Sequence, residues 1–380
     1  MAESISDNYK CNIPTKIWNL RKKKLHNQKN HPIEIIKKHI YNYFGDDYIK
    51  YDDLNEEVPI EDNFDKLLIC KDHPCRSKSD TYYIDEKNVL RTQTSCHQSS
   101  LLEKMIHELD TPLAKSRKFL VTGDVYRKDE IDKTHYPVFH QMEGLCIVND
   151  DTDPEKELKQ ILIGLVNYLF PGCQYRMNDD YFPFTNPSWE IEVDYKGNWL
   201  EILGCGITQT KILENTGHVG RRAWAFGLGL ERLAMILFKI PDIRIFWSND
   251  QKFLSQYDDG QIKIFKEYSK LEPTIQDISL WIKDEDLIKN NECLARSSWL
   301  KQNDFYDYIR SLDTNDMIES IERFDSFYHP YKKMLSHAYH ITYSCPNTKI
   351  TDPAILTKMS IDLHKSIYAE INEKLNVEHR

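Results

Sequence analysis

The chain has 380 residues with a formal net charge of −10, and 40% of its residues are hydrophobic and 12% aromatic. This length and composition are typical of a folded protein of two or three domains, and they exclude a disordered chain and a surface coated throughout by nucleic acid. The cysteines are scattered without a CxxC pair, which disfavours a disulfide framework or a zinc site and indicates a reducing compartment, and the longest apolar run, residues 161–170, is about half of the ~20 residues that a membrane span needs.

Residues 1–60 are polar and contain one helical pattern. Ile33, Ile36 and Ile40 recur at helical spacing after Pro32, a residue that favours the first turn of a helix. The opening residues, MAESISDNYK, have no hydrophobic signal core, and their acidic side chains disfavour a transit peptide. The basic run at residues 21–24 is either a solvated surface or a contact for RNA.

Residues 54–109 predict short elements before a helix. We expect a loop at 54–63, a strand at 81–84 and a helix at 101–109, capped by Ser99 or Ser100 with Glu103 in its first turn. The intervening segment TSCHQ, residues 94–98, carries small hydroxyls and an amide. These groups either bind the ammonium or carboxylate of a ligand or belong to the helix cap.

Residues 121–146, VTGDVYRKDEIDKTHYPVFHQMEGLC, predict two strands joined by a long polar loop. This hairpin carries an unusual number of polar groups, namely Arg127, Asp129, Asp132, His135, Gln141 and Glu143. An arginine on a rigid strand offers a planar fork for a phosphate, and Phe139 offers a face for a nucleobase. The alternative is a solvated, salt-bridged hairpin.

Residues 150–170 predict a helix with one apolar face, and strands are predicted at 174–177, 188–195 and 199–203. The last two strands are joined by a turn at Lys196-Gly197. We therefore expect a predominantly antiparallel sheet flanked by helices. Phe182 and Phe184 precede these strands and are either core residues or the walls of a pocket, and Glu201 lies on a strand opposite its apolar neighbours.

Residues 223–240, AWAFGLGLERLAMILFKI, predict a strand that runs straight into an apolar helix. Gly227 and Gly229 remove side chains where a ligand or another backbone approaches. Arg232 lies in the first helical turn, near the positive helix end that favours a polyanion. A GxG spacing by itself fits a close strand-helix contact equally well.

A second domain is predicted to begin near residue 273, after a polar and then helical stretch at 251–270. Its pattern is a strand at 275–282, a polar insertion at 284–303, a helix at 305–311, strands at 317–327 and 336–343, and a helix at 354–375, with only a short or frayed strand after it. This β-α-β-β-α order predicts a ferredoxin-like domain.

The hairpin and the strand-helix unit together resemble motifs 2 and 3 of class II aminoacyl-tRNA synthetases. The stretches WAFGLGLER at 224–232 and HQMEG at 140–144 are similar to phenylalanyl-tRNA synthetases in particular, as are residues 65–83, 91–98, 180–187, 199–206 and 240–247 in the same order. The single-chain layout resembles the monomeric mitochondrial type. One departure is Gln93, where the family typically has a histidine before Thr-Ser.

The resemblance implies an α+β fold in three parts: an N-terminal extension at 1–60, a class II catalytic domain at 61–272 and a ferredoxin-like anticodon-binding domain at 273–380. It implies a monomeric phenylalanine-tRNA ligase of the mitochondrial matrix, without membrane contact. Such an enzyme activates phenylalanine with ATP and transfers it to the 3'-terminal adenosine of tRNA(Phe), using Mg²⁺ and neither zinc nor an organic cofactor.

The resemblance also implies roles for individual residues. Arg127 and Arg232 are the implied catalytic residues, and Glu201 is the implied Mg²⁺ ligand. The implied ATP-binding residues are Arg127, Asp129, His135, Phe139, Glu201, Gly229 and Arg232. The implied phenylalanine-binding residues are Thr94, Ser95, Gln98, Gln141, Glu143, Phe182, Phe184, Ala225 and Gly227.

Other functions remain open from the residues. Asp129 and Glu143 would also suit acid-base catalysis or metal binding, but no HxH, HExxH or nucleophile-elbow spacing accompanies them. An adenylate-forming enzyme with a different acceptor is disfavoured by the complete C-terminal domain. A non-catalytic RNA-binding protein is disfavoured by the pair Arg127 and Arg232.

Overall fold

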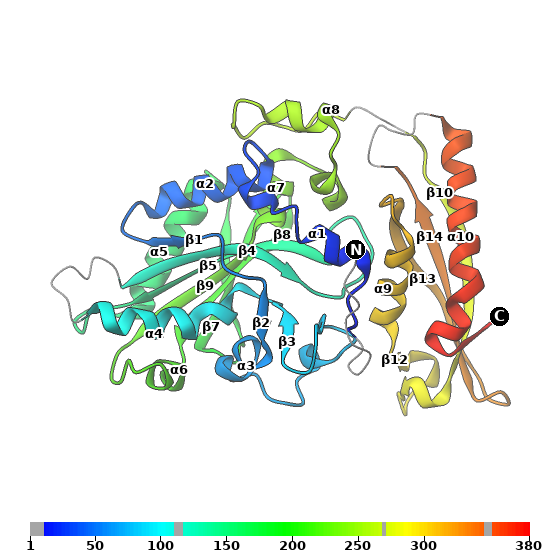
Figure 1. The fold of residues 1–380 in the computed structure, drawn as a ribbon, viewed down its shortest axis with the longest axis horizontal. Coiled ribbons are helices and arrows are strands. Elements are labelled where there is room, and N and C mark those ends of the chain that lie inside the picture. The colour runs from blue at the N-terminus through cyan, green and yellow to red at the C-terminus, as the bar shows by residue number, and fades with distance from the viewer. Residues whose placement is uncertain (1–10, 110–116, 268–270, 346–351) are drawn as a thin grey trace, which may run out of the picture.

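A seven-stranded sheet forms the centre of the larger part of the molecule in the computed structural model, which describes residues 11–109, 117–267, 271–345 and 352–380 (Figure 1). The strand order is β1-β4-β5-β9-β8-β7-β6, and neighbouring strands are antiparallel except for the parallel pair β1 and β4. The strands are β1 (Ile49–Tyr51), β4 (Lys118–Tyr126), β5 (Val138–Ile147), β9 (Ala223–Gly229), β8 (Asn198–Thr208), β7 (Thr185–Tyr195) and β6 (Tyr175–Asp180). The predicted antiparallel sheet is thereby confirmed.

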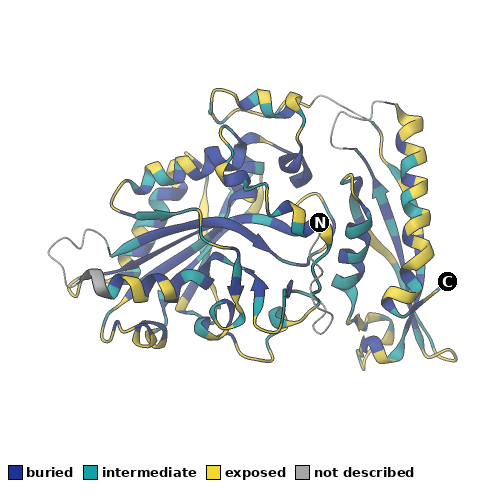
Figure 2. Cartoon of the chain, in the orientation of Figure 1, coloured by how far each residue is buried: buried dark blue, intermediate teal, exposed yellow. Residues whose placement is uncertain are grey.

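Helices cover both faces of this sheet, which explains why its central strands β4, β5 and β9 are mostly buried (Figure 2). The helices α2 (Pro32–Phe44), α5 (Pro154–Leu169) and α7 (Leu230–Phe238) contribute apolar residues to one core. The helices α4 (Gln98–Leu109) and α6 (Thr210–Asn215) contribute to the core on the other face. Alternate residues of β4, β5 and β9 enter each core, as the period of a strand requires.

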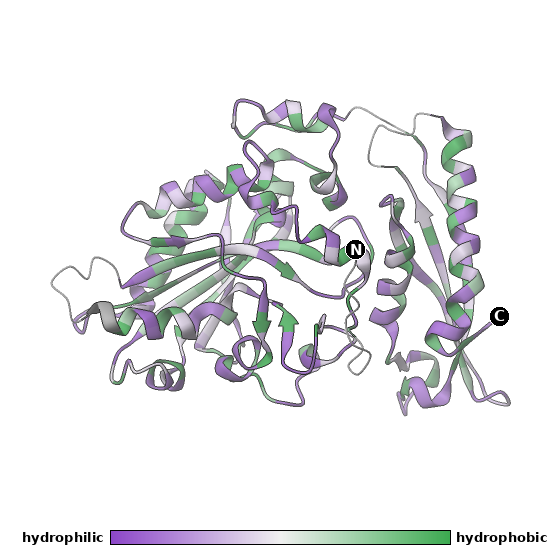
Figure 3. Cartoon of the chain, in the orientation of Figure 1, coloured by the Kyte–Doolittle hydropathy of each residue, from purple (hydrophilic) through white to green (hydrophobic). Residues whose placement is uncertain are grey.

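The apolar face and the end residues of α2 explain where this helix packs and where it begins and ends. Its residues at positions 33, 36, 40 and 44 are buried, and hydrophobic and hydrophilic residues alternate along it in Figure 3. His31 caps the start, since its Nδ1 accepts the backbone N–H of Ile33 at 3.2 Å. The helix ends at Gly45, whose φ of 71° suits glycine. The helix predicted from this pattern is therefore confirmed.

Several short elements differ from the sequence predictions. The expected loop at 54–63 contains β2 (Glu57–Pro59) and α3 (Ile60–Asn63), and β2 pairs with β3 (Asn88–Leu90). The expected strand at 81–84 is an irregular segment with one isolated bridge, from Tyr83 to Val89. The expected serine cap is wrong because α4 continues from a 3₁₀ turn, η4 (Thr94–His97), and the Ser100 hydroxyl donates backwards to the carbonyl of His97.

The C-terminal part is a four-stranded antiparallel sheet with two helices on one face. Its order is β13-β14-β10-β15, and the chain order β-α-β-β-α-β is the expected ferredoxin-like one. Its elements are β10 (Thr274–Lys283), α9 (Gln302–Leu312), β13 (Ile318–His329), β14 (Met334–Tyr343), α10 (Pro353–Leu375) and β15 (Val377–His379). The polar insertion holds two short strands, β11 (Leu287–Ile288) and β12 (Ser298–Trp299).

The remaining short elements are α1 (Thr15–Leu20) and α8 (Gln251–Leu254). The helix expected toward the end of 251–270 is not found in the described residues, since 258–267 are not helical, and residues 268–270 of that prediction lie outside the described part of the chain. Across the described residues no helix combines the length and the apolar character that spanning a bilayer requires.

The helix α9 lies between the two parts of the molecule (Figure 1). Ile131, at the tip of the β4-β5 hairpin, packs into the C-terminal core, and its carbonyl accepts the backbone N–H of Ile321 at 2.9 Å. The Tyr82 hydroxyl donates to Asp307 on α9 at 2.5 Å. The β4-β5 loop is therefore in direct contact with the C-terminal domain.

Candidate active site

Two adjoining cavities lie on the face of the large sheet that α4 covers. The larger has a volume of about 650 Å³ and the smaller about 290 Å³, and both are lined by Arg127, Asp129, Gln141, Glu201 and Gly227. The larger also takes in every residue predicted to bind phenylalanine: Thr94, Ser95, Gln98, Gln141, Glu143, Phe182, Phe184, Ala225 and Gly227. The smaller takes in every residue predicted to bind ATP: Arg127, Asp129, His135, Phe139, Glu201, Gly229 and Arg232. The structure thus brings all the predicted residues together, while their individual roles stay predictions.

A buried carboxylate lies at the centre of the larger cavity. Glu143 on β5 is only 2% exposed and accepts hydrogen bonds from the Ser95 hydroxyl and, at 2.8 Å, from Gln98 Nε2. Burial raises the pKa of Glu143 to about 7, although both hydrogen bonds favour the ionised form. No cation among residues 11–109, 117–267, 271–345 and 352–380 is bonded to it, so this carboxylate is suited to receive the ammonium group of a ligand.

The two glycines of the GLG stretch lie directly opposite the polar residues of β5. In the register of β5 and β9, Gly227 pairs with Glu143 and Gly229 with Gln141. A Cβ added at either glycine would meet no other atom within 4 Å. Open space here favours the ligand explanation of the GxG spacing over a close strand-helix contact.

An aromatic wall closes one side of the larger cavity. The rings of Phe182 and Phe184 stack with centroids 5.8 Å apart, and the Phe182 ring contacts Gly204, where an added Cβ would be 2.7 Å from its Cζ. Ala225, 4% exposed on β9, lines the same cavity. Gly204 was missed by the sequence analysis, and the only signal for it was its place in the GCG stretch of β8.

The smaller cavity has cations beside an aromatic ring. The Arg127 guanidinium lies 5.3 Å from the Phe139 ring centroid, and its Nε donates to the carbonyl of Thr92 at 2.8 Å. Burial lowers the pKa of Arg127, but an arginine stays charged at any physiological pH. Arg232, at the start of α7, donates from Nη1 to the carbonyl of Glu201 at 3.0 Å and lies 3.3 Å from its carboxylate. These groups suit a flat base and a phosphate chain.

Two carboxylates, those of Asp129 and Glu201, line both cavities, and that of Glu201 lies on β8. In the register of β7 and β8 it stands opposite Glu192. Mg²⁺ in nucleotide sites is usually held by one or two carboxylates together with phosphate oxygens, so Glu201 fits that use. Elsewhere on the hairpin, Glu130, Asp132 and His135 place one ligand atom each within 4.8 Å of one another. There the His135 Nδ1 is already bonded to Asp132 at 2.7 Å.

A buried pair joins the two halves of the site. Glu231 on α7 accepts the backbone N–H of His140 at 2.7 Å and lies 2.6 Å from Nδ1 of the same residue. Both side chains are almost fully buried. This bond fixes Arg232, the next residue of α7, relative to Phe139 and Gln141 on β5. The pairing connects residues 91 positions apart, so the sequence alone offered no signal for it.

The C-terminal domain also reaches the site, which the sequence analysis did not predict. Asn303 on α9 lines the larger cavity and donates to Asp80 at 2.6 Å. Arg310 donates to the carbonyls of Asp129 and Glu130 at 3.1 and 2.7 Å. The loop that carries Asp129 is therefore held from the side of the C-terminal domain.

Comparisons with known proteins agree with this geometry. Residues 17–257 match the model of the tRNA synthetases class II core domain (F). The chain is 42% identical to the chloroplastic/mitochondrial phenylalanine-tRNA ligase of Arabidopsis thaliana, over 97% of this chain and 82% of that protein. It is 38% identical to the mitochondrial phenylalanine-tRNA ligase of Mus musculus, over 90% of this chain and 81% of that protein, and 34% identical to that of Saccharomyces cerevisiae, over 93% and 89%.

Proposed function

The chain belongs to the phenylalanine-tRNA ligase family of class II tRNA synthetases, and from this membership we propose that it activates phenylalanine with ATP and transfers it to tRNA(Phe) in mitochondria. The observation that supports this most directly is the buried Glu143 carboxylate at the centre of a pocket lined by Phe182 and Phe184, which opens into a second cavity lined by Arg127 and Arg232. An amino acid with an aromatic side chain matches the first compartment, and a nucleoside triphosphate matches the second.

Phenylalanine is proposed to bind with its ammonium group at Glu143. Its ring would then lie against Phe182 and Phe184, with Ala225 beneath the para position. Thr94, Ser95 and Gln98 line the same pocket, and Gln141 accepts the backbone N–H of Thr94 at 3.3 Å. The aromatic wall of this pocket selects by size and shape. It rejects an added ring hydroxyl only weakly, because no polar group of the protein loses a hydrogen bond when that hydroxyl binds.

ATP is proposed to bind with its adenine between Phe139 and the Arg232 guanidinium. Such a sandwich uses stacking on one side and a cation-π contact on the other. Asp129 would accept a hydrogen bond from the adenine amino group, and His135 lines the same cavity. Mg²⁺, held by Glu201 and the phosphates, would neutralise charge on the pyrophosphate group.

The first reaction needs no nucleophile from the protein. A carboxylate oxygen of phenylalanine attacks the α-phosphorus of ATP, the bond from phosphorus to the bridging oxygen breaks, and pyrophosphate leaves. Arg127 stabilises the charge that develops on the α-phosphate, and the two cavities hold the reacting atoms in line. In the second reaction the ribose hydroxyl of the tRNA terminus attacks the carbonyl carbon of the adenylate, and AMP leaves.

The proposed division of the chain is an extension at 1–60, a catalytic domain at 61–272 and a tRNA-binding domain at 273–380, acting as a monomer. The outer face of the C-terminal sheet supports tRNA binding, because Trp281 is covered by Lys332, whose Nζ lies 4.7 Å from the ring. Arg380 lies 4.7 Å from the neighbouring Phe327 ring. Aromatic rings beside cations are the usual means of holding unpaired bases and phosphates.

Pyrophosphate exchange with each amino acid in turn tests the first step, and tRNA charging tests the second. We expect phenylalanine-dependent exchange above that with any other amino acid, and charging of tRNA(Phe). The charge reversal Lys332→Glu should reduce charging and leave exchange unchanged. Exchange that depends on an amino acid other than phenylalanine would contradict the proposed substrate.

A further inference from the structure

The wall of the larger cavity that carries Thr94 and Ser95 is held in place by one buried arginine. Arg91, 1% exposed, donates from Nη1 to the carbonyl of Leu54 at 3.2 Å and to Nε2 of His97, the last residue of η4, at 2.9 Å. Burial, and next Arg91 itself, lower the pKa of His97 to about 3, so its ring is neutral and Nε2 accepts the arginine proton. The position of η4 therefore depends on where the Arg91 guanidinium lies.

The other side of the same guanidinium is bound to β4. Arg91 Nε donates to the carbonyl of Asp124 at 2.7 Å, and Nη2 donates to its carboxylate at 3.0 Å. The guanidinium lies against Gly123, where an added Cβ would be 2.0 Å from Nη2. Gly123 pairs directly with Gln141 in the register of β4 and β5. Arg91 thus spans from the strand beside the pocket to the 3₁₀ turn above it.

Asp124 requires more than one cation. Its carboxylate is 1% exposed, and besides Arg91 it accepts a hydrogen bond from Tyr126 at 2.6 Å and from Lys24 Nζ at 3.0 Å to both oxygens. Burial alone would raise the pKa of Asp124, but Arg91 and Lys24 outweigh it and hold the pKa well below its usual range. Lys24 is the only one of these partners that comes from the N-terminal extension.

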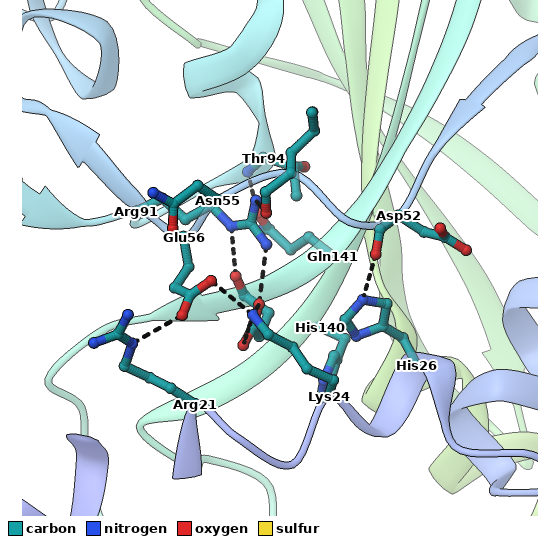
Figure 4. A network of polar contacts seen from close by, with 12 residues as sticks. Arg21, Lys24, His26, Asp52, Asn55, Glu56, Arg91, Thr94, His140 and Gln141 are labelled. Atoms are coloured by element: carbon teal, nitrogen blue, oxygen red, sulfur yellow. Dashed lines mark hydrogen bonds and ion pairs between the residues drawn. The ribbon is translucent and has the colours of Figure 1, made fainter. Parts of the chain in front are cut away.

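The backbone at Lys24 is held in an uncommon conformation. Its φ of 44° lies in the left-handed region, which a non-glycine residue adopts at an energetic cost. Lys24 Nζ also bonds to Glu56 at 2.7 Å, and Glu56 bonds to Arg21 Nε at 2.9 Å. Figure 4 shows Arg21, Lys24, Glu56 and Arg91 gathered in this network next to the segment with Thr94.

We propose that Lys24 is a positioning residue for the amino-acid pocket, which it orders through Asp124, Arg91 and η4 without touching the substrate. Without Lys24, Arg91 is the one cation among the described residues that still pairs with the buried Asp124 carboxylate. The guanidinium is then drawn toward the carboxylate and away from His97, and η4 shifts relative to Glu143 and Gln141. This inference rests on the proposed function, because it concerns affinity for phenylalanine.

The effect should be selective for phenylalanine over ATP. Arg127 depends on the carbonyl of Thr92, and Thr92 has its own anchor in the buried Asn63. The side-chain Oδ1 of Asn63 accepts the backbone N–H of Thr92 at 3.0 Å, and Asn63 Nδ2 donates to the Thr92 hydroxyl at 3.0 Å. The Arg232 contacts to Glu201 share no residue with the Lys24 network. A shift of η4 therefore leaves the nucleotide cavity in place.

The test compares Michaelis constants in pyrophosphate exchange for Lys24→Met, Lys24→Arg and the control Lys22→Met, an exposed lysine of the same segment. Lys24→Met should raise KM for phenylalanine about tenfold, as loss of a supporting partner behind a site commonly does, and change KM for ATP by less than about twofold. Lys24→Arg should restore KM for phenylalanine to within about threefold of the wild type. Lys22→Met should behave as the wild type.

The Lys24 side chain is 35% exposed, so truncation leaves no closed cavity. If Lys24→Met does not fold, Lys24→Gln gives the same comparison with a neutral side chain.

Two results would overturn the inference: an unchanged KM for phenylalanine in Lys24→Met, or an equal rise in KM for both substrates. Each of these requires a wild-type enzyme that exchanges pyrophosphate with phenylalanine. A wild-type protein without such exchange would refute the proposed function itself, and the inference with it. The two failures are therefore distinguished by the wild-type measurement.

Discussion

The substitution Glu143→Gln should make the protein more stable and less active. The carboxylate is 2% exposed, and no cation of the described part of the chain pairs with it. Burial raises its pKa from the ordinary value of 4.5 to about 7. At about 1.4 kcal/mol per pKa unit, this difference corresponds to roughly 3 kcal/mol of destabilisation at pH 8, where the group is ionised in both the folded and the unfolded chain.

The sign of the pH dependence follows from the raised pKa. Below pH 4.5 Glu143 is protonated in both states, and it has no effect on the free energy of unfolding. Between that pH and about 7 the unfolded chain ionises while the folded protein does not, so stability declines as the pH rises. The amide of Glu143→Gln removes this decline. It can still bond to Ser95 and Gln98, because Gln98 Oε1 has no partner and the Gln98 amide can turn over.

The loss of activity comes from the ammonium group of phenylalanine, which would lose its counter-charge. Removing one partner of a buried, hydrogen-bonded charge pair costs about 2–5 kcal/mol, or roughly 30-fold to several-thousand-fold in kcat/KM. For the wild type, kcat/KM for phenylalanine should fall about tenfold per pH unit below about pH 7, as Glu143 is protonated in the free enzyme. This dependence should be absent in Glu143→Gln.

The assays are pyrophosphate exchange and urea unfolding, each at pH 5 and pH 8. Glu190→Gln is a matched control, since Glu190 is a half-buried carboxylate on β7 that bonds to Asn178 at 3.1 Å and lines neither cavity. The control should change neither quantity substantially. The reasoning would be refuted if Glu143→Gln kept its activity within about threefold of the wild type, or if it were less stable than the wild type at pH 8.

Three further predictions concern other parts of the site. Arg127→Ala and Arg232→Ala should each lose several kcal/mol of transition-state stabilisation, measured as a lower rate of pyrophosphate exchange, while the circular dichroism spectrum stays normal. Near wild-type exchange in a folded variant would contradict their roles. Ala225→Gly should admit para-chlorophenylalanine in pyrophosphate exchange by deepening the pocket; continued exclusion, with phenylalanine activation intact, would show that Ala225 is not its floor. The wild type should activate tyrosine measurably, with discrimination on the order of 100-fold, and a far larger ratio would require a polar group facing the ring.

Elements with local sequence signals could be predicted before the structure was known. The β4-β5 hairpin, the strand-helix unit at Gly227 and Arg232, and the ferredoxin-like order of the C-terminal domain all follow from periodicity and short motifs. All the site residues predicted from the sequence line the two cavities. They could be predicted because they lie in short contiguous motifs. Local errors arose where short signals compete, as at 54–63 and at the start of α4.

Which distant groups support that site depends on tertiary packing and could not be predicted from the sequence. Lys24 meets Asp124 across 100 positions, and Arg310 meets Asp129 across 181. Neither contact has a periodic or spacing signal, since each depends on how separate elements pack and on the need to pair buried charges and carbonyls. The GxG pattern likewise could not distinguish a ligand site from a close strand-helix contact at Gly227 and Gly229. The pairing of β9 with β5 shows open space at both glycines, opposite polar side chains.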